Sequence, residues 1–229
     1  MFIPLKDDNP TARFPAVTVG LIAANVAVFA FLALSSKGLE YSILRMGAIP
    51  YEITHFRTLP DFPVARVSPP LSLLLHMFLH GGLFHLLGNM LYLWIFGNNV
   101  EDVLGRFRFA IFYLVCGLSA SLTHIAFNPG STVPMIGASG AIGGVLGAYA
   151  LLFPHARVRT LVFLFIFVEV VPVPAALMLG LWFVMQIMNI GLGGGVAWFA
   201  HIGGFLVGMA LVWAFKKKRP ETVDFRARF

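Results

Sequence analysis

Residues 137–153 read GASGAIGGVLGAYALLF, an uncharged and glycine-rich stretch. A turn sequence, Asn128–Ser131 (NPGS), precedes it, and Pro154 follows it. These signals predict a short apolar helix over residues 139–153. Glycines let membrane helices pack closely, so the stretch indicates a helix inside a membrane bundle.

The composition of the whole chain also indicates a membrane protein. Of the 229 residues, 59% are apolar and 11% are charged, whereas about 25% are charged in an ordinary soluble domain. A spanning helix needs about 20 mostly apolar residues. The predicted spans are about 14–34, 82–98, 104–126, 139–153, 175–191 and 197–215. Residues 14–34 exceed the roughly 7–15 apolar residues of a signal peptide. We therefore predict an all-α integral membrane protein with a six-transmembrane-helix bundle.

Two further segments do not have the character of a span. Residues 36–70 contain five prolines and are too polar to cross a bilayer, so a long, partly structured loop is predicted. Residues 160–173 are apolar but carry Glu169, and about 14 residues are too few to span comfortably. We predict that they form an interfacial or re-entrant piece.

The positive charges predict the orientation of the chain. Lysines and arginines cluster outside the spans, at Lys6 and Arg13, Arg106 and Arg108, Arg157 and Arg159, and residues 216–219. With six spans all four clusters fall on one side, which the positive-inside rule makes cytoplasmic. Such clusters are typical of membrane-protein loops rather than of a nucleic-acid-binding face, although the net charge is +6. The predicted parts are a cytoplasmic N-terminus (1–13), a membrane domain (14–215) and a basic cytoplasmic tail (216–229), in a cell inner membrane.

Ser139 is the first polar residue with a candidate role, because polar groups inside a membrane are costly and are functional candidates. It opens the predicted short helix, where free N–H groups and the positive end of the helix dipole can stabilise an oxyanion. Gly137 and Gly140 would let backbone and substrate approach closely. Ser139 is therefore a candidate nucleophile, and the alternative is a simple N-cap.

His201, in Ala200–Gly204 (AHIGG), lies near the start of the sixth span. An imidazole can act as general base for a serine, whereas a lone membrane histidine can also merely hydrogen-bond a neighbouring helix. No carboxylate lies in either helix, so a Ser/His dyad is predicted in place of a Ser-His-Asp triad. The imidazole would then be oriented by packing or by a non-acidic partner.

Topology brings these two candidate residues together. The fourth and sixth spans both run from outside to inside, so their N-terminal ends lie at the same membrane depth. Each helix carries a glycine stripe below its polar residue, and such stripes let membrane helices pack closely. The stripes are Ser139, Gly143 and Gly147 on one helix, and His201, Gly204 and Gly208 on the other. If the stripes face each other, the hydroxyl and the imidazole come into contact.

A third polar group lies in residues 76–89 (HMFLHGGLFHLLGN). His85 and Asn89 are four residues apart, on one face of the second span, and both can donate hydrogen bonds to a developing oxyanion. His80 precedes a Gly-Gly break and is expected in the loop above. Because His76 and His80 are also four residues apart, a metal site is the alternative. No cysteine or carboxylate accompanies them, and we predict no metal or other cofactor.

In combination, these motifs resemble the rhomboid intramembrane serine proteases of bacterial type. The likeness rests on GASG at residues 137–140, on the spacing of His80, His85 and Asn89, and on AHIGG at residues 200–204. The segments IPLKDDNP at residues 3–10 and FGNNVED at residues 96–102 also resemble bacterial members. The likeness covers nearly the whole chain.

The resemblance implies a Ser139/His201 dyad. It implies an oxyanion site formed by His85, Asn89 and the backbone N–H of Ser139, with His80 supporting water access and the site. The supporting glycines would be Gly137, Gly140, Gly143 and Gly204.

The resemblance also implies roles away from the dyad. The long loop after the first span would lie partly in the outer leaflet. The fifth span and the glycine-rich loop Gly191–Gly195 would gate substrate entry. Glu101 would tie together the cytoplasmic end of the bundle.

Two positions depart from the family pattern. Many relatives carry an aromatic residue four positions after the nucleophile, where it stacks on the catalytic histidine, and here that position is Gly143. The Trp-Arg pair that some members carry in the first loop is replaced by Leu71-Ser72. The first departure leaves open what orients His201.

The expected function is intramembrane cleavage of transmembrane protein substrates within the lipid bilayer, with no nucleic acid partner. A non-catalytic rhomboid-like binder of membrane-protein clients is the main alternative. A small transporter would need paired charges near the bilayer midplane. Glu169 is the one candidate for such a charge, and the sequence offers it no partner.

Overall fold

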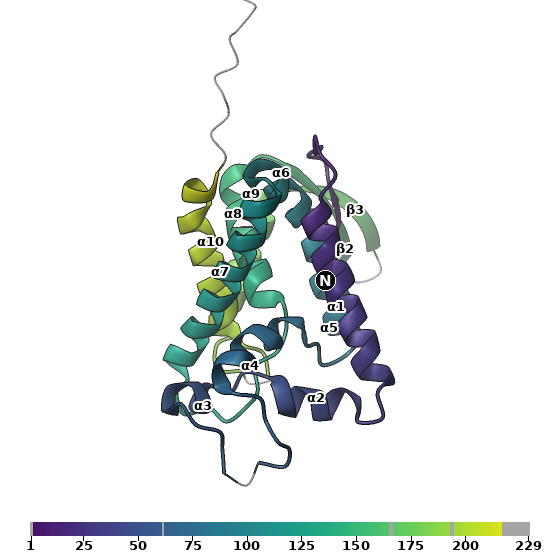
Figure 1. Cartoon of the computed structure of the whole chain (residues 1–229). Coiled ribbons are helices and arrows are strands. Elements are labelled where there is room, and N and C mark those ends of the chain that lie inside the picture. The colour runs from purple at the N-terminus through teal and green to yellow at the C-terminus, as the bar shows by residue number, and fades with distance from the viewer. Residues whose placement is uncertain (1, 61, 165–166, 193–194, 217–229) are drawn as a thin grey trace, which may run out of the picture.

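The computed structural model describes residues 2–60, 62–164, 167–192 and 195–216 (Figure 1). The helices are α1 (Ala16–Leu34), α2 (Gly38–Met46), α3 (Pro50–His55), α4 (Pro69–Leu75), η1 (His76–Phe78), α5 (Leu83–Tyr92), η2 (Leu93–Gly97), α6 (Asn98–Leu104), α7 (Arg106–Phe127), α8 (Ser139–Leu152), α9 (Ala175–Met188) and α10 (Trp198–Phe215). The strands are β1 (Phe2–Asp7), β2 (Arg157–Leu164) and β3 (Phe167–Pro174).

The predicted helical membrane bundle is confirmed. Within the described residues, α1, α7 and α10 are each long and apolar enough to cross a bilayer. The segments Pro69–Phe78 and Leu83–Leu104 form a fourth apolar unit, bent by 79°, and α8 and α9 are shorter apolar helices of 14 residues each. Helices thus occupy all six predicted ranges, while the number that cross the membrane stays a prediction.

The second predicted span continues further than expected. Helix α5 passes through the π-helical turn η2 into α6, so residues 98–104 are helical rather than a loop. The chain turns at Gly105, whose φ of 80° suits glycine. This extension places Glu101 beside the start of α1, where its carboxylate accepts hydrogen bonds from Val17 N, Thr18 N and Thr18 Oγ1 at 2.7–3.0 Å. Glu101 therefore satisfies free amides at the N-terminus of α1 and ties two helices together.

Within residues 160–173, predicted as an interfacial or re-entrant piece, the described residues belong to a three-stranded antiparallel sheet, and their position relative to the membrane stays a prediction. The hairpin of β2 and β3 pairs with β1, in the order β1-β2-β3, so the description as all-α omits a small sheet. Valines recur through β2 and β3 and favour strands. The prolines lie in the edge strands β1 and β3, where a missing N–H is tolerated.

The sheet is fastened to the helices through Asp7 at the end of β1. Its buried carboxylate accepts hydrogen bonds from Tyr149 Oη at 2.6 Å and Asn99 Nδ2 at 2.7 Å. Removal from water raises the pKa of the Asp7 carboxyl above its ordinary value, and the Tyr149 hydrogen bond opposes that rise. The N-terminal strand is thereby joined to α6 and α8.

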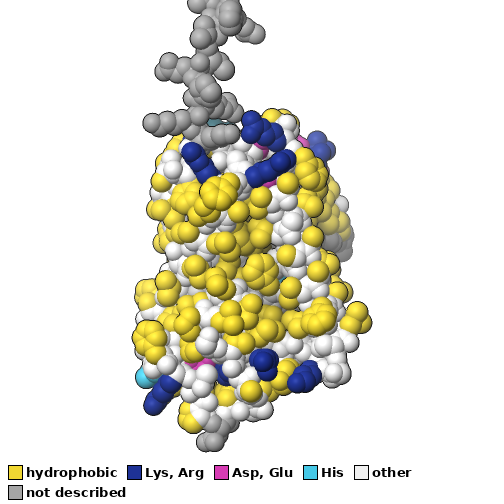
Figure 2. Space-filling view, in the orientation of Figure 1, with side chains coloured by type: hydrophobic (Ala, Val, Ile, Leu, Met, Phe, Trp, Pro, Cys, Tyr) yellow, Lys and Arg dark blue, Asp and Glu magenta, His cyan; other side chains and the backbone are white. Residues whose placement is uncertain are grey.

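Charged side chains gather at the two ends of the molecule, and hydrophobic side chains cover the surface between them (Figure 2). At the end with the sheet, Arg159 pairs with Asp8 at 2.9 Å, and Arg108 donates to the carbonyls of Phe215 and Lys216. Glu169 is exposed on β3, outside the helices, so it is not the buried charge that a transporter would need. The predicted basic tail lies outside the described residues beyond Lys216.

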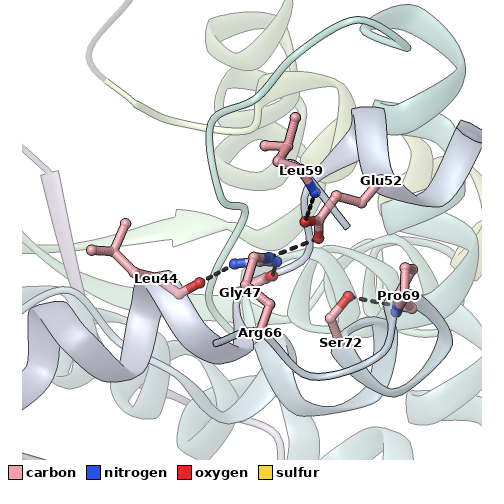
Figure 3. A network of polar contacts seen from close by, with 7 residues as sticks. All are labelled: Leu44, Gly47, Glu52, Leu59, Arg66, Pro69 and Ser72. Carbon is pink, nitrogen blue, oxygen red and sulfur yellow. Dashed lines mark hydrogen bonds and ion pairs between the residues drawn. The ribbon is translucent and has the colours of Figure 1, made fainter. Parts of the chain in front are cut away.

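The long loop after α1 contains the short helices α2, α3 and α4, at the end opposite the sheet (Figure 1). Figure 3 shows the buried ion pair that holds it, in which Arg66 Nε lies 2.7 Å from Glu52 Oε2. The Arg66 guanidinium also donates to the carbonyls of Leu44 and Gly47, and Glu52 Oε1 accepts from Leu59 N. The two charged side chains are 1% and 0% exposed, so their partners replace water completely.

This loop braces the segment that leads into α8. Ala48 and Met135 exchange two backbone hydrogen bonds, of 3.0 and 2.8 Å. Tyr51 N also donates to the carbonyl of Ser131 at 3.0 Å. The ordered loop thus fixes residues only a few positions before Ser139.

Helices α8 and α10 pack with their backbones in direct contact. A Cβ at Gly204 would overlap the carbonyl oxygen of Gly140, and one at Gly208 would overlap that of Gly144. A Cβ at Gly147 would overlap the Phe205 carbonyl in the same way. Gly204 and Gly208 thus meet Gly140 and Gly144, while Gly147 of the predicted α8 stripe lies against Phe205. These contacts set the distance between the helices.

Gly204→Ala places a methyl group against the Gly140 carbonyl and should force α10 away from α8. Overpacking of this kind costs about 1–3 kcal/mol, so the variant should unfold at a lower temperature in detergent. Gly20→Ala on α1 is the matched control, because a Cβ at Gly20 meets no atom within 4 Å. Equal unfolding midpoints for the two variants would contradict the close packing.

Arg66→Ala leaves the Glu52 carboxylate buried without its cation. Breaking a buried pair from one side costs about 3–5 kcal/mol, so the free energy of unfolding in detergent should fall by that amount. Arg57→Ala is the control in the same loop, because Arg57 is exposed and donates to Tyr51 Oη. A wild-type unfolding curve for Arg66→Ala would mean that the pair does not hold the loop.

Candidate active site

Ser139 lies at the first position of α8, after a sharply turned segment. Gly137 has a φ of 112°, which an L side chain rarely adopts, and its N–H donates to the His76 carbonyl at 2.9 Å. Because α8 starts at Ser139, the amides of its first turn have no acceptor within the helix. The hydroxyl and these free donors therefore sit together at the positive end of the helix dipole.

His201 lies in the first turn of α10 and reaches across to α8. Its Nε2 is 2.8 Å from Ser139 Oγ, so the structure brings the predicted pair into hydrogen-bonding contact. A Cβ at Gly140 would lie 3.8 Å from the Cβ of Ala200, which shows how near the two helix starts are. The hydroxyl and the imidazole thus meet where the glycine-lined helices converge.

Gly143 lies against the backbone of α10. A Cβ there would stand 3.0 Å from the His201 carbonyl oxygen and 3.5 Å from Phe205 N. A side chain at residue 143 would therefore begin in tight contact with the backbone of α10.

Gln186 of α9 takes the other side of the imidazole, and the sequence analysis missed it. Gln186 Oε1 lies 2.8 Å from His201 Nδ1, and the glutamine side chain is buried. Its polarity could have marked it as a candidate site residue in the sequence, since an amide within an apolar helix needs a hydrogen-bond partner. His201 therefore contacts a serine on one ring nitrogen and an amide oxygen on the other.

A cavity of about 420 Å³ opens beside the pair and is lined by both predicted oxyanion donors, His85 and Asn89. Gly81 N donates to His85 Nδ1 at 3.4 Å, so the proton of a neutral ring resides on His85 Nε2. That nitrogen faces Gly137, where a Cβ would stand 2.9 Å from it. Asn89 Nδ2 is buried and has no hydrogen-bond partner among the described residues. Two donors are therefore free to serve a ligand in this cavity.

His76 and His80 are not among the residues that line this cavity. His76 Nε2 forms a 2.6 Å hydrogen bond with Ser121 Oγ, and the His80 ring meets the His85 ring edge-on at 5.1 Å. A second cavity of about 20 Å³, lined by His76, Ser121 and Ser139, is large enough for one water. Across the described part of the chain, no three His, Cys, Asp or Glu side chains are grouped to hold a metal ion.

The remaining predicted site residues are placed as follows. Gly140 and Gly204 form the contact between α8 and α10, and Gly137 makes the turn before Ser139. The predicted glycine-rich gate loop, Gly191–Gly195, falls partly outside the described residues, at 193 and 194.

The chemical capacity of this arrangement follows from the two contacts of His201. An amide oxygen accepts hydrogen bonds only, so Gln186 Oε1 requires a proton on His201 Nδ1. Nε2 of the neutral ring then presents its lone pair to the Ser139 hydroxyl. This is the tautomer that can take a proton from a serine.

Comparison with known proteins places the chain among its relatives. The Rhomboid domain family model matches residues 69–218. Rhomboid protein 1, mitochondrial, of Saccharomyces cerevisiae is 28% identical over 227 residues, covering 90% of this chain and 62% of that protein. Rhomboid protease GluP of Bacillus subtilis is 39% identical over 140 residues, covering 61% and 25%. Presenilin-associated rhomboid-like protein, mitochondrial, of Homo sapiens is 32% identical over 149 residues, covering 63% and 35%.

The matches cover a larger share of this chain than of its relatives. The chain spans 62% or less of the length of each of these relatives, while the family model accounts for more than half of the chain. The matched region runs from α4 through α10 and includes the serine, both histidines of the cavity and Gln186. The chain belongs to the rhomboid family.

Proposed function

We propose that the chain is an intramembrane serine endopeptidase in which Ser139 is the nucleophile and His201 is its general base. The observation that carries the proposal is the 2.8 Å contact between Ser139 Oγ and His201 Nε2. The rhomboid family supports it, and one relative, GluP, is named a protease. A structural helix contact would not require a free hydroxyl, a correctly protonated imidazole and a donor-lined cavity at one point.

The proposed reaction begins when Ser139 Oγ attacks the carbonyl carbon of a peptide bond. His201 Nε2 takes the hydroxyl proton, and the C–N bond then breaks as His201 gives that proton to the leaving amine. A water attacks the acyl-enzyme in the same way and releases Ser139. His201 thus accepts the proton of Ser139 and gives it to the leaving amine, and then accepts a proton from water and gives it back to Ser139.

The oxyanion formed in both steps needs donors already in place. We assign this role to Asn89 Nδ2, His85 Nε2 and the Ser139 amide. Asn89 is 8% exposed and its amide donor has no protein partner among the described residues, so a substrate oxygen would satisfy a donor that is otherwise buried at a cost. His80, against the His85 ring, would hold that ring in place and support water access.

The proposed substrates are transmembrane segments of other membrane proteins. The cavity beside the pair is lined largely by apolar side chains, among them Phe84, Ile142 and Trp182. Phe84, at its lining, is exposed on the outside of the helices. A segment entering from the bilayer would keep its apolar side chains in an apolar environment while its backbone reaches Ser139. We propose α9 and the Gly191–Gly195 loop as the gate for this entry.

We propose further that the end carrying the sheet faces the cytoplasm, with both chain termini there, in a cell inner membrane. The arginines at residues 13, 106, 108, 157 and 159 support this orientation by the positive-inside rule. In that orientation α2, α3 and α4 lie toward the outer leaflet.

A fluorophosphonate probe should label the wild-type chain in detergent and should not label Ser139→Ala. His201→Ala should slow both labelling and cleavage of a transmembrane substrate by about 10²–10⁴-fold, because general base catalysis contributes that much. Ser119→Ala on α7 and His155→Ala, at an exposed position, are the controls and should label like the wild type. A folded wild-type chain that takes no label and cleaves nothing would favour the non-catalytic binder.

Asn89→Ala should lower kcat by about 10²–10³-fold with little change in KM, because an oxyanion donor acts mainly in the transition state. His85→Ala should act in the same direction. Leu87→Ala is the control on the same helix, since Leu87 is exposed on another face. An Asn89→Ala variant that changed KM alone would show that Asn89 binds substrate rather than the oxyanion.

A further inference from the structure

We infer that Gln186 is a positioning residue of this site, which fixes the tautomer and the ring orientation of His201. The inference rests on the proposed function and answers what replaces the missing aromatic at Gly143. Its basis is a chain of three hydrogen bonds that runs from the backbone of α9, through the Gln186 amide and the His201 ring, to Ser139 Oγ.

Gln186 is a buried polar residue in a helix that is otherwise apolar. The neighbouring side chains Met185, Ile187 and Met188 are exposed on the apolar surface, while Gln186 is 5% exposed and points inward. A buried amide costs free energy unless its oxygen and nitrogen are both hydrogen-bonded. Both atoms of the Gln186 amide are hydrogen-bonded, so specific partners offset the cost of burying it.

The orientation of the amide is fixed by its own helix. Gln186 Nε2 donates to the Trp182 carbonyl at 2.9 Å, and Oε1 faces His201 Nδ1. Exchanging the two ends would set Oε1 against the Trp182 oxygen, where two acceptors repel each other. The oxygen is thus the end presented to His201, and Nδ1 must donate.

The rest of the imidazole environment does not choose a tautomer. The rings of Trp182 and Trp198 each lie 6.0 Å from the His201 ring and restrict it by shape alone. Gly143 offers no side chain. Within the described residues, Gln186 Oε1 is the hydrogen-bond partner of His201 Nδ1, so the choice of protonated nitrogen depends on it.

Gln186 differs from the acid of a Ser-His-Asp triad in one respect. A carboxylate orients the histidine and also stabilises the imidazolium with a full charge. An amide oxygen orients the ring with only a dipole, and it brings no formal charge into the membrane. The expected contribution is therefore geometric.

The test compares three variants by kcat, KM, unfolding midpoint and the ¹⁵N NMR signals of His201. Gln186→Met keeps the length of the side chain and removes the oxygen acceptor, so kcat should fall by about 10²-fold at unchanged KM, the size expected for a misplaced catalytic group. Its His201 signals should lose the Nδ1–H form that the wild type shows. Gln186→Glu supplies an acceptor oxygen in either protonation state and should restore most of the rate. Met185→Leu, on the exposed side of α9, is the control.

Three results bear on the inference. Retained kcat and an unchanged Nδ1–H signal in Gln186→Met would overturn it, and so would equal losses in the Met and Glu variants. If Gln186→Met unfolds, the NMR spectra of the wild type and Gln186→Glu still test the inference. Both must then show the Nδ1–H form of His201, and its absence from either one would overturn the inference. A wild-type chain that neither labels with fluorophosphonate nor cleaves substrate would refute the proposed function instead, independently of the His201 tautomer.

Discussion

The contact of α8 with α10, backbone against backbone, is the constraint on which the rest of the structure depends. Glycines at 140, 144, 204 and 208 remove every side chain that would hold the helices apart. Because Ser139 directly precedes Gly140 and His201 lies one turn before Gly204, the distance between their side chains is set by the helix packing. The contact between Ser139 and His201 is therefore held by two helices, and the short helix α8 is long enough to provide its half.

The same close approach changes how the imidazole can be held. Gly143 lies against the His201 backbone and has no side chain to stack on the ring, so this position does not supply its orientation. Gln186 of α9 is within reach and supplies it through a hydrogen bond. Gly143, against the His201 backbone, and Gln186, on the His201 ring, thus both belong to the surroundings of this histidine.

Much of this could be predicted from the sequence, because membrane burial makes residue patterns restrictive. Apolar runs located the helices, and the glycines predicted that α8 and α10 pack closely. The glycines of α8 that meet Gly204 and Gly208 are Gly140 and Gly144, rather than the predicted Gly143 and Gly147. The sheet was missed because residues 160–173 are apolar without a helical or strand period strong enough to choose. Gln186 and the Arg66–Glu52 pair were missed for another reason, since each has its partner 14 or more residues away and only the folded chain brings them together.

The arrangement of α9 gives Gln186 a consequence beyond orientation. At its start the helix is anchored, since Ala175 N and Ala176 N donate to the carbonyls of Ala156 and Pro154. Towards its other end, Gln186 is the last buried side chain of the helix. The hydrogen bond to His201 thus joins the C-terminal half of α9 to α10, together with the packing of Phe183 on Phe205. Movement of this half away from α10 would remove the hydrogen-bond partner of His201 Nδ1. If α9 is the gate, the site would be catalytically ordered only when the helix lies against α10, so that substrate entry and base orientation would depend on the same contact.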